Sequence, residues 1–186
     1  IIDAEQCVVT SPKCDAFRLA LPVGVRRVAI RGFSLFVAFD GGLLPTVERV
    51  AASLVGLALC GDRYGGGHVM QDSHIIALIA PLVALRSFDL LVASAASDAT
   101  VTAIAASLSR LTHLRITHNA DYHRSFTSAG VAKLARLDRL RSLSLCGVGN
   151  VDDAAVNTIA QGLTRLTALN VSHCRLITTA GFAVLS

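Results

Sequence analysis

The 186 residues contain no tryptophan, and aromatic residues make up only 5%. Charged residues are also few, at 16%, whereas hydrophobic residues reach 53%. A membrane span needs an apolar run of about 18 residues or more, and charges or glycines interrupt every such stretch here. The start of the sequence has no basic segment followed by an apolar core, as a signal peptide would have. We therefore expect no membrane partner.

Cysteine is sparse, with five residues at wide spacing. A small extracellular domain usually has a dense, even set of cysteines, so reduced thiols and a cytoplasmic location fit better. Pairing of Cys7 with Cys14 is an alternative that the sequence leaves open. The first residue is Ile1 rather than Met, so we expect the chain to be part of a longer protein.

Motifs of catalysis and metal binding are missing too. The run Gly65–Gly67 lacks the Gly-Lys-Ser/Thr of a phosphate loop. The spacing of His113, His118 and His123 places them on neither one helical face nor one strand face. There is no Cys-x-x-Cys, His-Glu-x-x-His or nucleophile elbow. We therefore expect that the protein is not an enzyme and that it binds neither a metal nor a cofactor.

The net charge of +4 comes from 17 basic and 13 acidic residues. The basic residues are scattered except for two groups, Arg26, Arg27 and Arg31, and Arg136, Arg139 and Arg141. Nucleic-acid-binding proteins usually show a stronger basic stripe with aromatics between the charges. No nucleic-acid partner is expected, and the simplest interpretation is solvated surface charge.

What the sequence does contain is an internal repeat. A pattern of apolar residues, L-x-x-L-x-L, begins near residues 25, 54, 85, 111, 140 and 166, at steps of 26 to 31 residues. Its clearest copy is Leu166, Leu169 and Val171, followed by Cys174. Six copies at nearly constant steps indicate a repeat architecture, in which stacked units share one core.

A helix is expected after each apolar strand. Apolar residues at helical spacing follow a polar turn in every unit, as at Val101, Ile104, Ala105 and Leu108. A residue able to cap a helix precedes each of these stretches. The expected caps are Thr46, Asp72, Asp98, Thr127, Asp152 and Thr178.

The repeat resembles the leucine-rich-repeat family. Its last copy, Leu166 to Gly181, is similar to the cysteine-containing subclass that is common in F-box proteins, and units of 29 residues are similar to the ribonuclease-inhibitor type. The resemblance implies an α/β fold, a curved right-handed βα superhelix with a parallel sheet on its concave face. A doubly wound α/β domain is the alternative, but its strands would usually be longer.

We place the repeats at residues 25–186, and the two ends of this range differ. Residues 1–24 are expected to cap the first unit, with Leu19, Leu21 and Val23 in a partial strand. No polar cap is visible after the last unit. An uncapped end exposes apolar core, so we expect further repeats or another subunit to cover it.

The residues between the leucines predict a binding surface, because they point away from the core onto the concave face. Most are small. The larger polar residues expected there are Arg27, Arg31, Asp89, His113, Arg115 and Asn170. Arginine binds carboxylates through two parallel hydrogen bonds, so this face is expected to engage a partner with acidic features. Solvent exposure without a partner is the alternative.

Two long turns, residues 62–68 and 121–125, are expected on one rim of the solenoid. They contain arginine and tyrosine, which are favoured at interfaces. The candidate residues are Arg63, Tyr64, Tyr122 and Arg124. Tolerated loop insertion is the alternative interpretation.

These patterns favour a non-catalytic protein–protein interaction module or scaffold. The resemblance implies a second possibility, the substrate-recognition repeat domain of an F-box type ubiquitin ligase, although the chain has no F-box segment. Regulators of small GTPases also contain such repeats, but we identify neither their particular arginine nor their acidic tail. A secreted receptor is disfavoured, because the expected Cys-rich flanking caps are missing.

Overall fold

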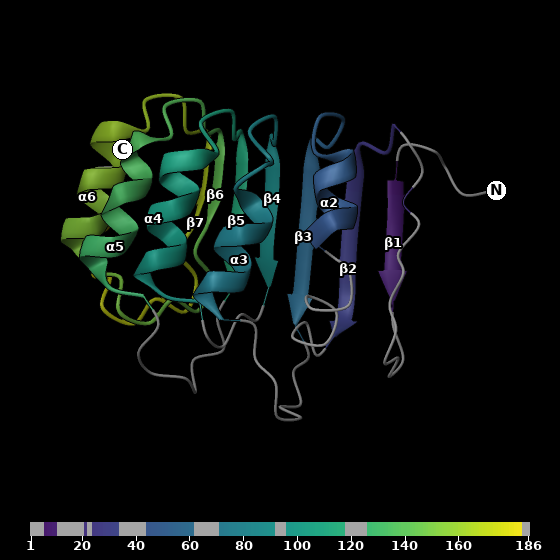
Figure 1. Cartoon of the computed structure of the whole chain (residues 1–186). Helices are drawn as coiled ribbons and strands as arrows, with labels where there is room; N and C mark the ends of the chain where they lie inside the picture. Colours follow the sequence, from purple (N-terminus) through teal and green to yellow (C-terminus); the bar gives the residue numbers. More distant parts are fainter. Residues whose placement is uncertain are drawn as a thin grey trace.

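The computed structural model describes residues 6–10, 21, 24–33, 44–61, 71–91, 96–117 and 126–183. Strands and helices alternate along the chain (Figure 1). The strands are β1 (Gln6–Thr10), β2 (Arg27–Phe33), β3 (Gly56–Gly61), β4 (Ser87–Leu91), β5 (His113–Thr117), β6 (Ser142–Ser144) and β7 (Ala168–Asn170). The helices are α2 (Leu44–Val50), α3 (Asp72–Ile79), α4 (Asp98–Ser107), α5 (Ser128–Ala132), η2 (Lys133–Arg136), α6 (Asp153–Gly162) and α7 (Thr179–Phe182).

All seven strands form one parallel sheet in sequence order, β1 to β7. Helices pack along one face of this sheet (Figure 1). The other face has no helix in the described part of the chain, and we call it the concave face. This architecture is the expected βα solenoid, because each unit adds one strand beside the previous one.

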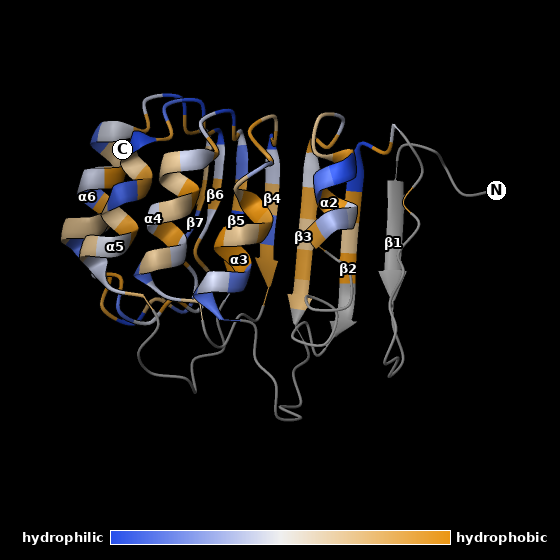
Figure 2. Ribbon diagram, viewed as in Figure 1, coloured by the Kyte–Doolittle hydropathy of each residue, from blue (hydrophilic) through white to orange (hydrophobic). Residues whose placement is uncertain are grey.

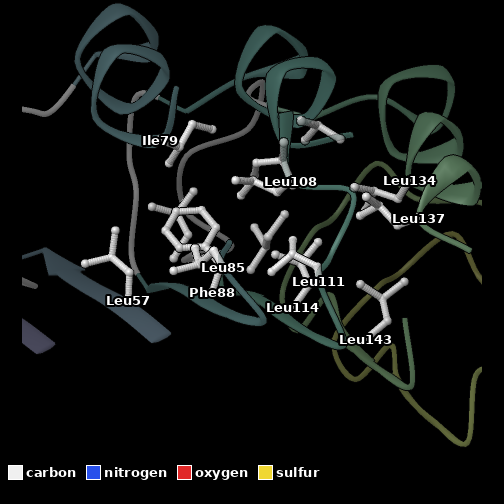
Figure 3. Close-up of a cluster of buried hydrophobic side chains, with 14 of the residues drawn as sticks. Leu57, Ile79, Leu85, Phe88, Leu108, Leu111, Leu114, Leu134, Leu137 and Leu143 are labelled. Carbon is white, nitrogen blue, oxygen red and sulfur yellow. The ribbon is translucent and has the colours of Figure 1, made fainter. Parts of the chain in front are cut away.

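The predicted leucine ladder forms the core. In β2 to β6, the three apolar residues of each L-x-x-L-x-L pattern are at most 3% exposed. Figure 3 shows Leu57, Phe88, Leu114 and Leu143 from successive strands facing helix residues such as Ile79. In Figure 2, much of β3 and parts of β4 and α3 are orange, the colour of apolar residues. The sequence prediction of a continuous core is therefore confirmed.

The start of the sheet differs from the expectation. The strand that precedes β2 is Gln6–Thr10, and Leu21 is buried outside any strand. Leu19 and Val23 lie outside the described residues. The segment Val8-Val9-Thr10 is β-branched throughout, which favours an extended backbone more strongly than the leucines later in this region do.

Three of the expected helix caps are confirmed and three are wrong. Thr127, Asp152 and Thr178 cap α5, α6 and α7 through their side chains. Thr46 lies inside α2 and does not cap it. Asp72 and Asp98 are the first residues of α3 and α4, and the N-caps of these helices are Gln71 and Ser97.

Aspartates at the first position of a helix join neighbouring repeats. Asp98 accepts hydrogen bonds from the backbone N–H of Thr127 at 2.8 Å and from its hydroxyl at 2.6 Å. Asp153 accepts the same pair from Thr178, at 2.8 and 2.6 Å. Asp72 likewise accepts from the N–H and hydroxyl of Ser97. Each carboxylate thus fixes the N-terminus of the next helix, which orders the stacking of the units.

The step from α5 to α6 reverses these roles. Ser128 occupies the first position of α5 and Asp152 caps α6. The Ser128 hydroxyl accepts from the N–H of Asp152 at 3.0 Å and donates to the carbonyl of Asn150 at 2.9 Å. A hydroxyl can both accept and donate, so one serine serves two main-chain groups of the next repeat.

Within the described residues, no helix is long and apolar enough to span a membrane.

Candidate functional site

The concave face is built from aligned columns of side chains. The strand register places Arg27 and His113, both predicted for this face, in one column, which consists of Arg27, Gly56, Ser87, His113, Ser142 and Ala168. A second column contains Ala29, Ala58, Asp89, Arg115, Ser144 and Asn170. Neighbouring strands in a sheet lie about 4.8 Å apart, so each column forms a closely spaced row.

The polar members of these columns differ in exposure. Arg27, His113, Arg115 and Asn170 are exposed, whereas Asp89 is half-buried. Arg31 lies in β2 and pairs with Cys60 of β3. Its side chain is outside the described residues. The exposed basic groups are therefore available to a ligand from the concave side.

Gly56 leaves room for the side chain of Arg27 to lie against the sheet. A Cβ atom added to Gly56 would lie 3.0 Å from Cγ of Arg27, so the aliphatic stem of this arginine lies directly over the glycine. Gly56 is buried while Arg27 is exposed. Long basic side chains commonly cover apolar surface with their stems and keep the charged end in water. The sequence analysis did not predict this contact. The signal for it was Gly56, a glycine between the core residues Leu54 and Leu57.

Opposite charges adjoin in the middle of the face. Asp89 of β4 and Arg115 of β5 are register partners. Beside them, Nδ1 of His113 lies 2.9 Å from the Thr112 hydroxyl. At the β7 end, the Asn170 side-chain oxygen accepts from the N–H of Ser172 at 2.9 Å, which leaves its amide group to donate. The face thus offers donors at several strands and one carboxylate at its centre.

The exposed polar side chains of this surface include the hydrogen-bond donors Arg27, Arg115 and Asn170. Arginine and amide groups bind carboxylates and main-chain carbonyls of a partner. The rim candidates Arg63, Tyr64, Tyr122 and Arg124 lie outside the described residues. No cluster of three metal-ligating side chains occurs among the residues that the structure describes.

The end of the solenoid near β7 is apolar. Phe182 is 51% exposed, although the equivalent residues of the two preceding repeats, Val131 and Val156, are at most 1% exposed. Leu176 is also 53% exposed, and Leu169 is only partly buried. Core positions of the last unit thus lack the covering layer that each earlier unit receives from its successor.

The signature cysteine of the last repeat is part of the core. Cys174 is 7% exposed, and its thiol donates to the carbonyl of Leu145 in the preceding repeat at 3.1 Å. Val148 occupies the equivalent position one repeat earlier and is 2% exposed. This position is structural, so it marks the repeat type and does not belong to the concave surface.

No protein-family profile matches the sequence, and no curated protein matches it. Solved structures do match. The structure of Rad7 in complex with Elc1 in yeast has 13% sequence identity and a TM-score of 0.62, over 87% of this chain and 47% of that chain.

The leucine-rich repeat-containing protein LegL7 from Legionella pneumophila is also similar. It has 18% identity and a TM-score of 0.53, over 84% of this chain and 50% of that chain. The chain thus spans about half the length of each. Together with the parallel sheet and its aligned leucine ladder, these similarities show that the chain has the leucine-rich-repeat fold.

Proposed function

We propose that this protein is a non-catalytic protein–protein interaction module that binds its partner on the concave face. The observation that carries the proposal is that exposed Arg27, His113 and Arg115 lie on the same face of the sheet, among small residues. Arg27 of β2 and Arg115 of β5 are forked donors, and each can bind a carboxylate of an extended partner segment. Asp89 adds a hydrogen-bond acceptor to this face, and Asn170 adds a donor. Four residues of the two long turns, Arg63, Tyr64, Tyr122 and Arg124, are proposed to extend the contact.

The leucine-rich-repeat fold is generally a protein-binding module, and Rad7, one of the similar structures, is itself in complex with another protein, Elc1. These facts support a protein partner and leave its identity open. Functional specificity resides in the residues between the leucines, because the ladder itself only makes the core.

The test is affinity capture from the native source with the full-length protein, followed by mass spectrometry. A variant with Arg27→Glu and Arg115→Glu reverses two charges on the concave face. Lys133→Glu with Arg175→Glu makes the same change of net charge at exposed positions outside it. The proposal expects the first variant to lose a partner that the wild type and the control retain; equal capture by all three contradicts it.

The F-box alternative has one observation in its favour. Cys174 occupies the signature position of the cysteine-containing subclass and bonds to the preceding repeat as a buried thiol. If this alternative holds, the captured proteins will include other subunits of a ubiquitin ligase. Their absence from repeated captures by the full-length protein would count against it.

We also propose that apolar surface from further repeats or another subunit packs against the β7 end. The exposure of Phe182 and Leu176 supports this. Light scattering tests the second option, because self-association through this end gives a mass that rises with concentration and that Phe182→Ser lowers. A concentration-independent mass equal to one chain contradicts self-association.

A further inference from the structure

Three successive repeats enter their strands through the same turn. Each turn has the sequence Leu-x-Arg-Leu and closes with a hydrogen bond from the last N–H to the first carbonyl, at 2.9 to 3.0 Å. The turns are residues 108–111, 137–140 and 163–166. Their leucines are anchored in or against the core. The third position of each turn is an exposed arginine, namely Arg110, Arg139 and Arg165.

A second set of arginines lies beside these turns. Arg86 and Arg141 immediately precede β4 and β6, and both side chains are exposed. Their carbonyls accept from the N–H groups of Thr112 and Thr167, each at 2.8 Å. The hydroxyls of the same threonines donate to these carbonyls at 3.0 Å. The backbone under this set is therefore fixed to the neighbouring repeat.

Together with Arg136 at the end of η2, these residues form what we call the arginine rim: Arg86, Arg110, Arg136, Arg139, Arg141 and Arg165. In Figure 2, the loops at the upper edge over β5 to β7 are correspondingly blue. Asp138 is the only acidic residue in the three turns, all of which the structure describes. None of the six arginines forms an ion pair with a described residue.

Among the described residues, four aspartates lie at the opposite edge of the sheet. Asp72, Asp98, Asp152 and Asp153 lie there at helix N-termini, where they are engaged in hydrogen bonds. Cations near helix C-termini complement the helix dipole, an effect worth about 0.3–1 kcal/mol each. That effect accounts for one arginine per helix. It does not account for Arg86 and Arg141, which precede strands, so the rim has more positive charge than the helices require.

We infer that the arginine rim is a binding surface for an acidic protein segment, distinct from the concave face. All six cations are arginines, whose planar forks bind carboxylates in pairs. Arg86 and Arg141 are two strands apart, about 10 Å, which three residues of an extended chain span at about 3.3 Å each. The three turns contain no aromatic residue on which nucleic-acid bases could stack. These features favour a glutamate- or aspartate-rich polypeptide over a nucleic acid.

Fluorescence anisotropy with a labelled glutamate-rich peptide tests the inference. The variant Arg139→Glu with Arg165→Glu reverses two rim charges, and Lys133→Glu with Arg175→Glu is the charge-matched control. We expect the rim variant to weaken binding about fivefold or more, because each substitution removes an arginine–carboxylate contact and adds a charge that repels the peptide. The control is expected to bind within about twofold of the wild type.

The concave variant, Arg27→Glu with Arg115→Glu, separates this inference from the proposed function. If the peptide binds on the arginine rim, the concave variant retains it. Weakening by the concave variant and not by the rim variant would place the peptide on the concave face and overturn the inference. Equal weakening by the rim and control variants overturns the inference, because net charge alone then explains binding. Tighter binding of an oligothymidine than of the peptide also overturns it, in favour of a nucleic-acid surface. Circular dichroism of every variant verifies that it is folded.

Discussion

Asp98, the first residue of α4, lies against Thr127, the N-cap of α5, so closely that the third position of α5 has no room for a side chain. That position is Gly130, and a Cβ atom there would overlap with the Asp98 carboxylate. Asp98 accepts from the N–H and the hydroxyl of Thr127 at 2.8 and 2.6 Å. Asp153, Thr178 and Gly181 repeat the arrangement at the last described repeat junction.

Gly130→Ala is therefore expected to destabilise the protein. Alanine in a helix is normally favoured over glycine by up to about 1 kcal/mol. Here the new methyl group displaces Asp98, and the loss of two hydrogen bonds to a charged acceptor at a partly exposed site costs about 1–3 kcal/mol. Urea unfolding measures the difference. Gly149→Ala is the control, because a Cβ atom there has nothing within 4 Å.

A double-mutant cycle identifies the cause. In an Asp98→Ala background the overlapping atoms are gone, so Gly130→Ala should become neutral or stabilising by up to about 1 kcal/mol. An equal penalty in both backgrounds would show that the glycine is needed for another reason, and the proposed link between repeats would be wrong.

Stability should fall in acid through Asp72 and Asp152. Burial raises the pKa of Asp72, but hydrogen bonds from Ser97 and Thr100 outweigh this and hold its pKa below the ordinary value. The backbone N–H of Ala155, followed by Ser128, lowers the pKa of Asp152. Because both folded-state pKa values are depressed, the stabilisation is complete above the unfolded-state pKa, about 3.9, and is lost as pH falls through the folded-state values.

Denaturant unfolding from pH 7 downward measures this dependence. Asp72→Asn should lower stability at pH 7 and flatten the acid limb of the profile, since one linked proton is removed. Asp138→Asn is the control, an exposed carboxylate without a hydrogen bond to a described residue. Identical acid limbs for the wild type and Asp72→Asn would contradict the account.

Cys174 should resist alkylation. Burial raises the pKa of its thiol to about 11, so at pH 8 only about one molecule in a thousand holds the reactive thiolate. Cys146 is half-buried and serves as the internal comparison. Peptide mapping after a short iodoacetamide pulse should find Cys146 modified well before Cys174. Modification of Cys174 at the same rate would show that the thiol is not held in the core.

Truncation of equivalent leucines should expose the difference between the middle and the end of the solenoid. Leu143 is 1% exposed, whereas Leu169, its equivalent in the last strand, is only partly buried. At concentrations at which the protein is monomeric, so that no second copy covers the β7 end, Leu143→Ala should cost about 3 kcal/mol and Leu169→Ala about 1 kcal/mol, because a partly solvated site leaves little cavity. Thermal unfolding compares the two. Equal losses would mean that the end is covered in solution.

The ladder and the columns of the concave face could be predicted from the sequence, because burial imposes a strict pattern on every strand. Leu114 and Ile116 must point inward, so Arg115 must point outward. The roles of Asp72 and Asp98, which are not caps, could not be predicted from local pattern, since these carboxylates accept hydrogen bonds from residues 25 to 29 positions later. One signal was available: Thr-Ser-Ala-Gly at 127–130 recurs as Thr-Thr-Ala-Gly at 178–181.

The first strand was predicted in the wrong place for a similar reason. Leu21 is buried, as an apolar residue of the cap should be, but burial alone does not specify a strand. The strand at Gln6–Thr10 pairs with β2 without an L-x-x-L-x-L pattern of its own. The repeat pattern therefore predicts the strands that contain it, and it cannot predict a strand outside the pattern, such as Gln6–Thr10.

The most direct test of the central claim is arginine footprinting of the complex with a captured partner. Phenylglyoxal modifies exposed arginines, and mass spectrometry gives the extent at each position. Binding on the concave face predicts that the partner protects Arg27 and Arg115 while Arg175 reacts as in the unbound protein. Unchanged modification of Arg27 and Arg115 at saturating partner would contradict it.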